Sequence, residues 1–224
     1  MKLYNFGIII LCLCSCKHQL TEKEQAVEKF NQGVSLNLAA IKAQDVGNPE
    51  KAADLNKQSI IRFREVFEID STYPHIRSAL AHCLYIDKQL DEAISLFESD
   101  IKANGEMAVS YRELGLCKIN LGKVDEGRSA IDKAFSLDTS KEIRAITIQD
   151  LEDISDLAFS YGESYKKEGQ TDKGKDYQQF SIIVLTMALE YNRSDDKIEK
   201  KLLELAQKSG NNEALEYYKN VIRK

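Results

Sequence analysis

The 224-residue sequence has no tryptophan and only two prolines, Pro49 and Pro74. Because proline interrupts helices, this scarcity favours a chain of helices joined by tight turns. The sequence also has no basic block: 31 basic and 36 acidic residues are interspersed and leave a net charge of −5. Nucleic acid is therefore excluded as an expected partner, since its binding needs clustered cations. A hydrophobic content of 43% with 30% charged residues indicates a globular chain rather than a disordered one.

No apolar run is long enough to span a membrane. The N-terminal one, which follows Lys2, has roughly 12 residues where a spanning helix needs about 20. This length predicts a signal peptide over residues 1–15. The ending Leu13-Cys14-Ser15-Cys16 resembles a bacterial lipobox. That resemblance implies cleavage before Cys16, diacylglycerol and an N-linked acyl chain such as palmitate on Cys16, and a lipidated tether over residues 16–21.

Two alternatives for this N-terminal segment stay open: an ordinary secreted signal, and metal binding by cysteines and His18. The second fits poorly, because alternating cysteines at a chain terminus are not the spacing of a structural zinc site. Lys17 follows Cys16, and no aspartate stands there to indicate retention in the inner membrane. We therefore expect a lipid-anchored protein of the cell envelope, at the outer membrane, facing either the periplasm or the surface.

A 34-residue pattern occurs twice in succession between Pro74 and Lys141. Both copies place a large residue beside a small one, and a second small residue twelve positions later. The matching positions are Leu80-Ala81, Ala93 and Phe97 in the first copy and Leu114-Gly115, Gly127 and Ile131 in the second. This pattern resembles the tetratricopeptide repeat (TPR) family. The resemblance implies an all-α fold, a right-handed superhelix of about five helix pairs.

The expected repeat domain covers residues 22–224. Its units are about 22–73, 74–107, 108–141, 142–193 and 195–224. Residues 142–154 are interpreted as a helical insertion, with the regular part of the fourth unit beginning near Ser155. Apolar residues at three- and four-residue steps predict amphipathic helices in the first and last units. They include Val27, Phe30, Val34, Leu38 and Ile41 in the first unit, and Ile198, Leu202 and Leu205 in the last.

No arrangement of residues indicates catalysis or a cofactor. His75 and His82 would lie about 10 Å apart along one helix, too far to share a metal ion without further ligands. Ser164 and Lys167 match a serine acyl-enzyme motif, but its companion motifs are missing. Cys83 and Cys117 occupy equivalent repeat positions. Equivalent residues of neighbouring helices are expected about 10 Å apart, so packed thiols are favoured over a disulfide.

In TPR arrays the first helix of each pair lines a concave face. The resemblance implies that this face binds a protein or peptide segment here, because apolar anchors lie beside cations. Packing against neighbouring helices is the alternative role for each residue. The expected groove residues are His75, His82, Tyr85, Ile86, Arg112, Ile119, Asn120, Phe159 and Lys166.

These observations favour a non-enzymatic, membrane-anchored scaffold for protein–protein interaction in the bacterial cell envelope. The alternative is a helical-repeat lipoprotein that binds a ligand for a glycan or nutrient uptake system. Three tyrosines, Tyr161, Tyr165 and Tyr177, would then serve as aromatic platforms for a sugar.

Overall fold

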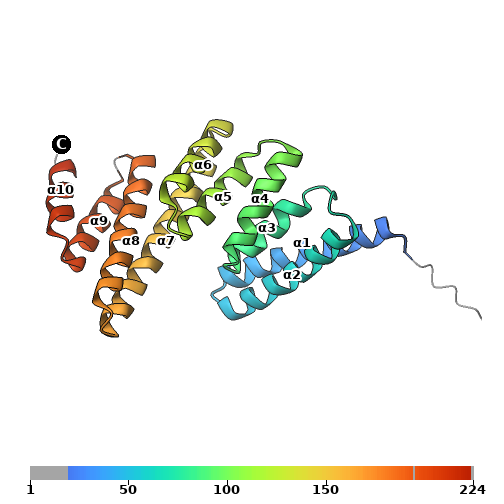
Figure 1. Ribbon diagram of the computed structural model, residues 1–224, viewed down its shortest axis with the longest axis horizontal. Coiled ribbons are helices and arrows are strands. Elements are labelled where there is room, and N and C mark those ends of the chain that lie inside the picture. The colour runs from blue at the N-terminus through green and yellow to red at the C-terminus, as the bar shows by residue number, and fades with distance from the viewer. Residues whose placement is uncertain (1–19, 194, 223–224) are drawn as a thin grey trace, which may run out of the picture.

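The computed structural model of the protein describes residues 20–193 and 195–222. Over these residues the chain forms ten α-helices and no strand. Consecutive helices pair, and the pairs follow one another along the long axis of the molecule (Figure 1). The pairs are α1 (Glu22–Asp45) with α2 (Pro49–Ile69), α3 (Ile76–Ile86) with α4 (Leu90–Asn104), α5 (Ala108–Asn120) with α6 (Val124–Leu137), α7 (Lys141–Lys167) with α8 (Thr171–Tyr191), and α9 (Asp196–Ser209) with α10 (Asn212–Ile222). The predicted all-α solenoid of helix pairs is confirmed.

The predicted signal peptide and the lipidation site Cys16 lie outside the described residues. None of the helices between residues 20 and 222 that the structure describes is both long and apolar enough to cross a bilayer.

The turns inside three helix pairs share one backbone conformation. Gly122 and Gly169 take φ angles of 78° and 81°, the left-handed region that favours glycine. Lys88 takes the equivalent position between α3 and α4 with φ of 63°. The backbone N–H of Lys88 donates to the Tyr85 carbonyl, as that of Gly122 does to Ile119.

Small residues let the paired helices approach closely, as the repeat pattern predicted. A Cβ atom added at Gly115 would lie 2.7 Å from the carbonyl oxygen of Gly127. Gly162 and Gly174 face each other in the same way between α7 and α8. These contacts involve backbone, which cannot rotate away, so each position excludes any larger side chain.

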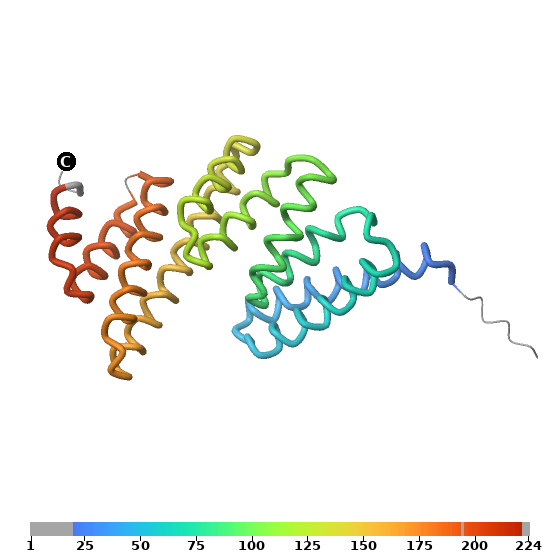
Figure 2. The backbone as a smooth tube through the Cα atoms, in the orientation of Figure 1, coloured from blue at the N-terminus to red at the C-terminus, as the bar shows by residue number. Residues whose placement is uncertain are grey.

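The predicted insertion at residues 142–154 is not a separate element. The structure shows one continuous helix, α7, from Lys141 to Lys167. Ile143, Ile148 and Leu151 bury the first half of this helix in the same core that holds its second half. The fourth pair is therefore lengthened rather than interrupted, as the tube in Figure 2 shows.

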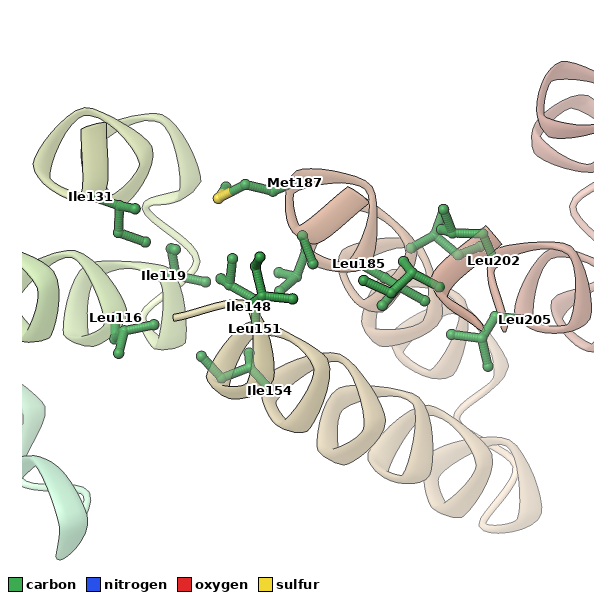
Figure 3. Packing of buried hydrophobic residues seen from close by; sticks show 14 of the residues in the cluster. Leu116, Ile119, Ile131, Ile148, Leu151, Ile154, Leu185, Met187, Leu202 and Leu205 are labelled. Carbon is green, nitrogen blue, oxygen red and sulfur yellow. The ribbon is translucent and has the colours of Figure 1, made fainter. Parts of the chain in front are cut away.

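The buried hydrophobic residues form two clusters. The first is built on α1–α6 and includes Phe63, Leu84 and Phe97. The second is built on α5–α10, and Figure 3 shows Leu151, Leu185 and Leu202 within it. Helices α5 and α6 contribute to both clusters.

Helix α1 departs from the predicted pattern of burial. Its buried residues are small: Ala26, Gly33, Ala40 and Ala43. The apolar stripe predicted from the sequence is mostly exposed instead, at Val27, Val34, Leu38 and Ile41. The ring of Phe63 on α2 lies against Gly33, which explains why the small face of α1 turns inward.

Candidate protein-binding groove

Two adjacent cavities lie along the first helices of the first three pairs. One, of about 360 Å³, is lined mainly by α1, α3 and α5, including Leu38, His82 and Val109. The other, of about 390 Å³, lies where α1 and α3 end and α2 begins, and includes Ile41 and Ile86. Asn37 lines both cavities. We call the two together the α1–α3 groove.

The wall of the groove is apolar and accessible. Large hydrophobic residues from three separate helices are exposed there: Val34, Leu38, Ile41, Ile86 and Val109. They come together although α1 and α5 are far apart in sequence. An apolar surface of this kind, continued over several elements, is typical of an interaction site rather than of scattered surface residues.

A polar network closes the side of the groove toward α7. Nδ1 of His82 lies 2.9 Å from Oε1 of Glu113 and donates to it. Glu113 lies 3.8 Å from Nη1 of Arg112. The Nη2 of Arg112 donates to Asp150, and its Nε donates to the hydroxyl of Thr147 at 3.2 Å. The network therefore ties α3 and α5 to the first half of α7.

Two groups in this network have shifted pKa values, one through a neighbouring charge and one through burial. Burial opposes protonation of His82, but the hydrogen bond and the charge of Glu113 outweigh burial and raise the pKa of His82 above its usual range. Burial also raises the pKa of Asp150, although Arg112 opposes this. His82 thus gains a proton more readily than a free histidine, next to a carboxylate that stabilises it.

The structure brings three predicted groove residues together. His75 and His82 line the cavity between α1, α3 and α5, and Ile86 lines the cavity at the helix ends. Tyr85 is half-buried against both hydrophobic clusters, with the Lys88 ammonium 5.4 Å from its ring centroid. The role of these residues in binding stays a prediction.

Other predicted groove residues do not face the groove. Ile119 is fully buried, and Phe159 is buried in the same second cluster. Arg112 is buried in the polar network, so its charge is already neutralised by Asp150 and Glu113. The length of α7 explains the burial of Arg112 and Ile119, because its first half covers α5 with Ile148 and Leu151 (Figure 3). Phe159 lies on α7 itself and turns into the second cluster.

The two remaining predicted residues lie away from the α1–α3 groove. Asn120 donates from its side chain to the Leu116 carbonyl and lines a separate cavity with Phe180. Lys166 donates to the side chain of Gln178 within the fourth pair. Neither residue contacts His82 or Ile86, so the predicted set is divided among at least two surfaces.

Sequence reasoning missed the contribution of α1. A signal for it was present, because Ala26, Gly33 and Ala40 are seven residues apart and form a second, small-residue stripe. A helix with both stripes can bury only one of them against a single partner helix. Here the small stripe packs on α2, and the large one is left at the groove.

The three tyrosines considered for sugar binding contact one another. The ring centroids of Tyr165 and Tyr177 are 5.3 Å apart, and those of Tyr161 and Tyr177 are 5.9 Å apart. The Lys173 ammonium lies 3.9 Å from the centroid of Tyr165. The three rings therefore pack on one another, and their role in sugar binding stays a prediction.

The two described cysteines are buried thiols, as predicted. Burial raises the pKa of Cys83 to about 11 and that of Cys117 to about 12. Because the thiolate is the reactive form, neither side chain suits nucleophilic or redox chemistry at neutral pH. Among the described residues, no group of three or more His, Cys, Asp or Glu side chains gathers as a metal site.

No protein-family model matches the sequence, and no curated protein does. Among solved structures, one titled "Crystal structure of MamA" is 20% identical with a TM-score of 0.41, over 79% of this chain and 87% of that one. "Crystal structure of MamA protein" is 17% identical with a TM-score of 0.42, over 84% and 96%. "MamA 41-end from Desulfovibrio magneticus RS-1" is 16% identical with a TM-score of 0.37, over 74% and 98%.

Proposed function

We propose that this protein is a non-enzymatic scaffold that holds a polypeptide segment of another protein in the α1–α3 groove. The observation that carries the proposal is the exposed apolar surface that α1, α3 and α5 contribute to one groove. Grooves between helices bind segments through apolar anchors, and polar groups at the edge fix their orientation.

We further propose that the scaffold is held at the bacterial cell envelope, at the outer membrane, by lipid on Cys16. The lipobox-like ending of the first sixteen residues supports this step. Two or three acyl chains on one cysteine hold a protein at a membrane far longer than a single chain does. In this arrangement the helix pairs would present the groove to other envelope proteins.

The binding proposal is tested by cross-linking in intact cells, followed by purification of the protein from solubilised envelopes. Leu38→Glu should abolish capture of envelope proteins, because it places a charge on the groove wall. Ile61→Glu is the matched control: Ile61 on α2 and Leu38 are each 54% exposed, and Ile61 lines neither cavity of the groove. The same proteins captured by Leu38→Glu as by the unmodified chain would refute binding in this groove.

The anchor is tested separately by Cys16→Ser. We expect this variant to appear in the soluble fraction after cell lysis, and the unmodified protein to sediment with membranes. Labelling with a radioactive fatty acid should mark the unmodified protein alone. A Cys16→Ser variant that still sediments with membranes would contradict the lipid anchor and leave the groove proposal untouched.

A further inference from the structure

The cavity at the ends of α1 and α3 has apolar walls and an acidic rim. Its apolar lining includes Ala40, Ile41 and Ile86, and among the described residues its charged lining consists of Asp45 and Asp87. Over both cavities of the groove, the described lining residues include three carboxylates, from Asp45, Asp87 and Glu113, and no lysine or arginine.

The two rim carboxylates have no cation of their own. Neither Asp45 nor Asp87 belongs to an ion pair within the part of the chain that the structure describes. Asp87 accepts a hydrogen bond from the side chain of Gln89 at 2.7 Å. Glu113 differs, because His82 and Arg112 already balance its charge. A positive charge from outside is therefore best received at the rim formed by Asp45 and Asp87.

The helix ends at this cavity add to the preference for a cation. Asp45 is the last residue of α1 and Ile86 is the last of α3, while Pro49 is the first of α2. A helix carries partial negative charge at its C-terminus and partial positive charge at its N-terminus. Two negative ends and one positive end meet here.

A buried acceptor stands at the cavity wall. Asn56 is 1% exposed, and its side-chain N–H donates to the Cys83 carbonyl at 2.9 Å. Its Oδ1 has no hydrogen-bond partner among the described residues. Buried polar atoms are normally paired, so a donor brought to this wall by an occupant would satisfy an otherwise isolated oxygen.

From these observations we infer that the α1–α3 groove takes a cationic amphipathic segment of a partner protein. Its apolar side chains cover Leu38, Ile41 and Ile86. A lysine or arginine enters the cavity at the helix ends, with its aliphatic stem on the apolar wall and its charge between Asp45 and Asp87. Such side chains combine a hydrophobic stem with a charged head, which matches a cavity of this composition. This inference rests on the proposed function and specifies the chemistry of the partner.

Two designed helical peptides test the inference against the full chain in detergent. Both carry leucines at the same positions of one face. One has lysine and the other glutamate at the flanking positions. Fluorescence anisotropy should show the lysine peptide binding about tenfold more tightly at low salt, and this preference should shrink in high salt because exposed charges are screened. Equal binding, tighter binding of the glutamate peptide, or no binding of the lysine peptide overturns the inference.

Variants of the rim test where the charge is received. Asp45→Asn combined with Asp87→Asn should weaken the lysine peptide by about threefold to tenfold, the range for two exposed charge pairs. The control removes two exposed acids outside the groove, Glu68→Gln with Asp172→Asn, and should leave the affinity unchanged. Unchanged affinity in the rim variant overturns the assignment of the cation to this cavity, provided that circular dichroism shows an intact fold.

The two proposals fail in different ways. Envelope proteins that the unmodified chain captures and Leu38→Glu loses would support groove binding. If the bound segments of these proteins are neutral or acidic, the same experiment overturns the cationic partner. Capture that is insensitive to Leu38→Glu would overturn groove binding itself.

Discussion

Helices α1 and α9 carry apolar residues at similar spacings and use them in opposite ways. In α9, Ile198 and Leu202 are completely buried in the second core. In α1, Val34 and Leu38 are exposed at the groove. Both helices lie near an end of the array, but α9 packs between α8 and α10, whereas α1 packs mainly on α2.

The difference teaches that spacing alone does not decide which residues are buried. Helix α1 has an alternative face of small residues, and Phe63 fits closely against Gly33 on that face. Helix α9 has no such alternative and must bury its large residues to pack at all. A helix with two usable faces can therefore reserve its large apolar side chains for a partner.

The largest expected effect comes from truncating the buried leucine of α9, compared with the same truncation of the exposed leucine of α1. Leu202→Ala should lower the free energy of unfolding by about 2–5 kcal/mol, because it opens a cavity in a packed core. Leu38→Ala should change this free energy by no more than about 0.5 kcal/mol, as expected for an exposed side chain. Urea unfolding followed by circular dichroism measures both. Similar losses in the two variants would contradict the assignment of their faces.

A smaller effect is expected from filling the small face of α1. Gly33→Ala should lower the free energy of unfolding by about 1–3 kcal/mol, because overpacking forces neighbours apart. The added Cβ would lie 2.6 Å from Cε1 of Phe63. Intrinsic helix propensity acts in the opposite direction and favours alanine by about 0.5–1 kcal/mol.

Ser35→Ala on the same helix is the control, since Ser35 is exposed. We expect a change in unfolding free energy below about 0.5 kcal/mol for this variant. A Gly33→Ala protein more stable than the unmodified one would show that α1 does not pack through its small face.

The N-terminal caps of α1 and α9 should contribute equally to the free energy of unfolding, although the apolar faces of these helices do not. Thr21 accepts a hydrogen bond from the Glu24 N–H at the start of α1, and Asp195 accepts from the Lys197 and Ile198 N–H groups at the start of α9. Replacing either residue with alanine should cost about 1 kcal/mol of unfolding free energy. Gln170→Ala is the control, because Gln170 precedes α8 without a side-chain cap bond. A Gln170→Ala loss as large as the other two would refute this reasoning.

The smallest effect is a pH dependence at the groove. Protonated His82 is stabilised by Glu113, which raises the pKa of His82 despite burial and despite the nearby charge of Arg112; Asp150 acts in the same direction as Glu113. A raised pKa contributes stability that is fully present below the unfolded pKa, about 6.5, and is lost as the pH rises through the folded value.

The stability difference between the unmodified protein and His82→Gln should therefore be larger at pH 6 than at pH 8.5. Because the His82 side chain is 34% exposed, solvent screening limits this change to roughly a few tenths of a kcal/mol. His75→Asn is the control. His75 is exposed, outside the ion pair, and has φ of 63°, which asparagine tolerates. An equal pH dependence in both variants would contradict a specific role for the pair of His82 and Glu113.

The 34-residue repeat was sufficient to predict the helix pairs and their small contact residues. Its large-and-small pattern marked Gly115 and Gly127, which meet where α5 and α6 approach closely, because this feature depends on residues within one unit. The repeat period did not reveal that α7 is continuous through residue 154, although the sequence carried a signal for it: no proline or glycine separates the supposed insertion from the rest of the helix.

The candidate site was less predictable than the fold. His75, His82 and Ile86 do line the groove, because His82 and Ile86 belong to the short regular helix α3 and His75 directly precedes it. Ile119 and Phe159 were assigned to the groove by analogy with regular repeats. The first half of the long α7 covers Ile119, and Phe159 lies on α7 itself with its side chain in the second core. The contribution of Leu38 depends on which face α1 turns toward α2, and that choice is made by packing rather than by periodicity.

Helix α5 has a consequence for how the whole chain unfolds. It supplies Leu114 and Cys117 to the first core, and Leu116 and Ile119 to the second. Arrays of repeats can melt from their ends, because each unit touches only its neighbours. A central helix held from both sides joins the two halves into one cooperative block. Damage at α5 should therefore spread in both directions, whereas loss of α10 would fray only one end.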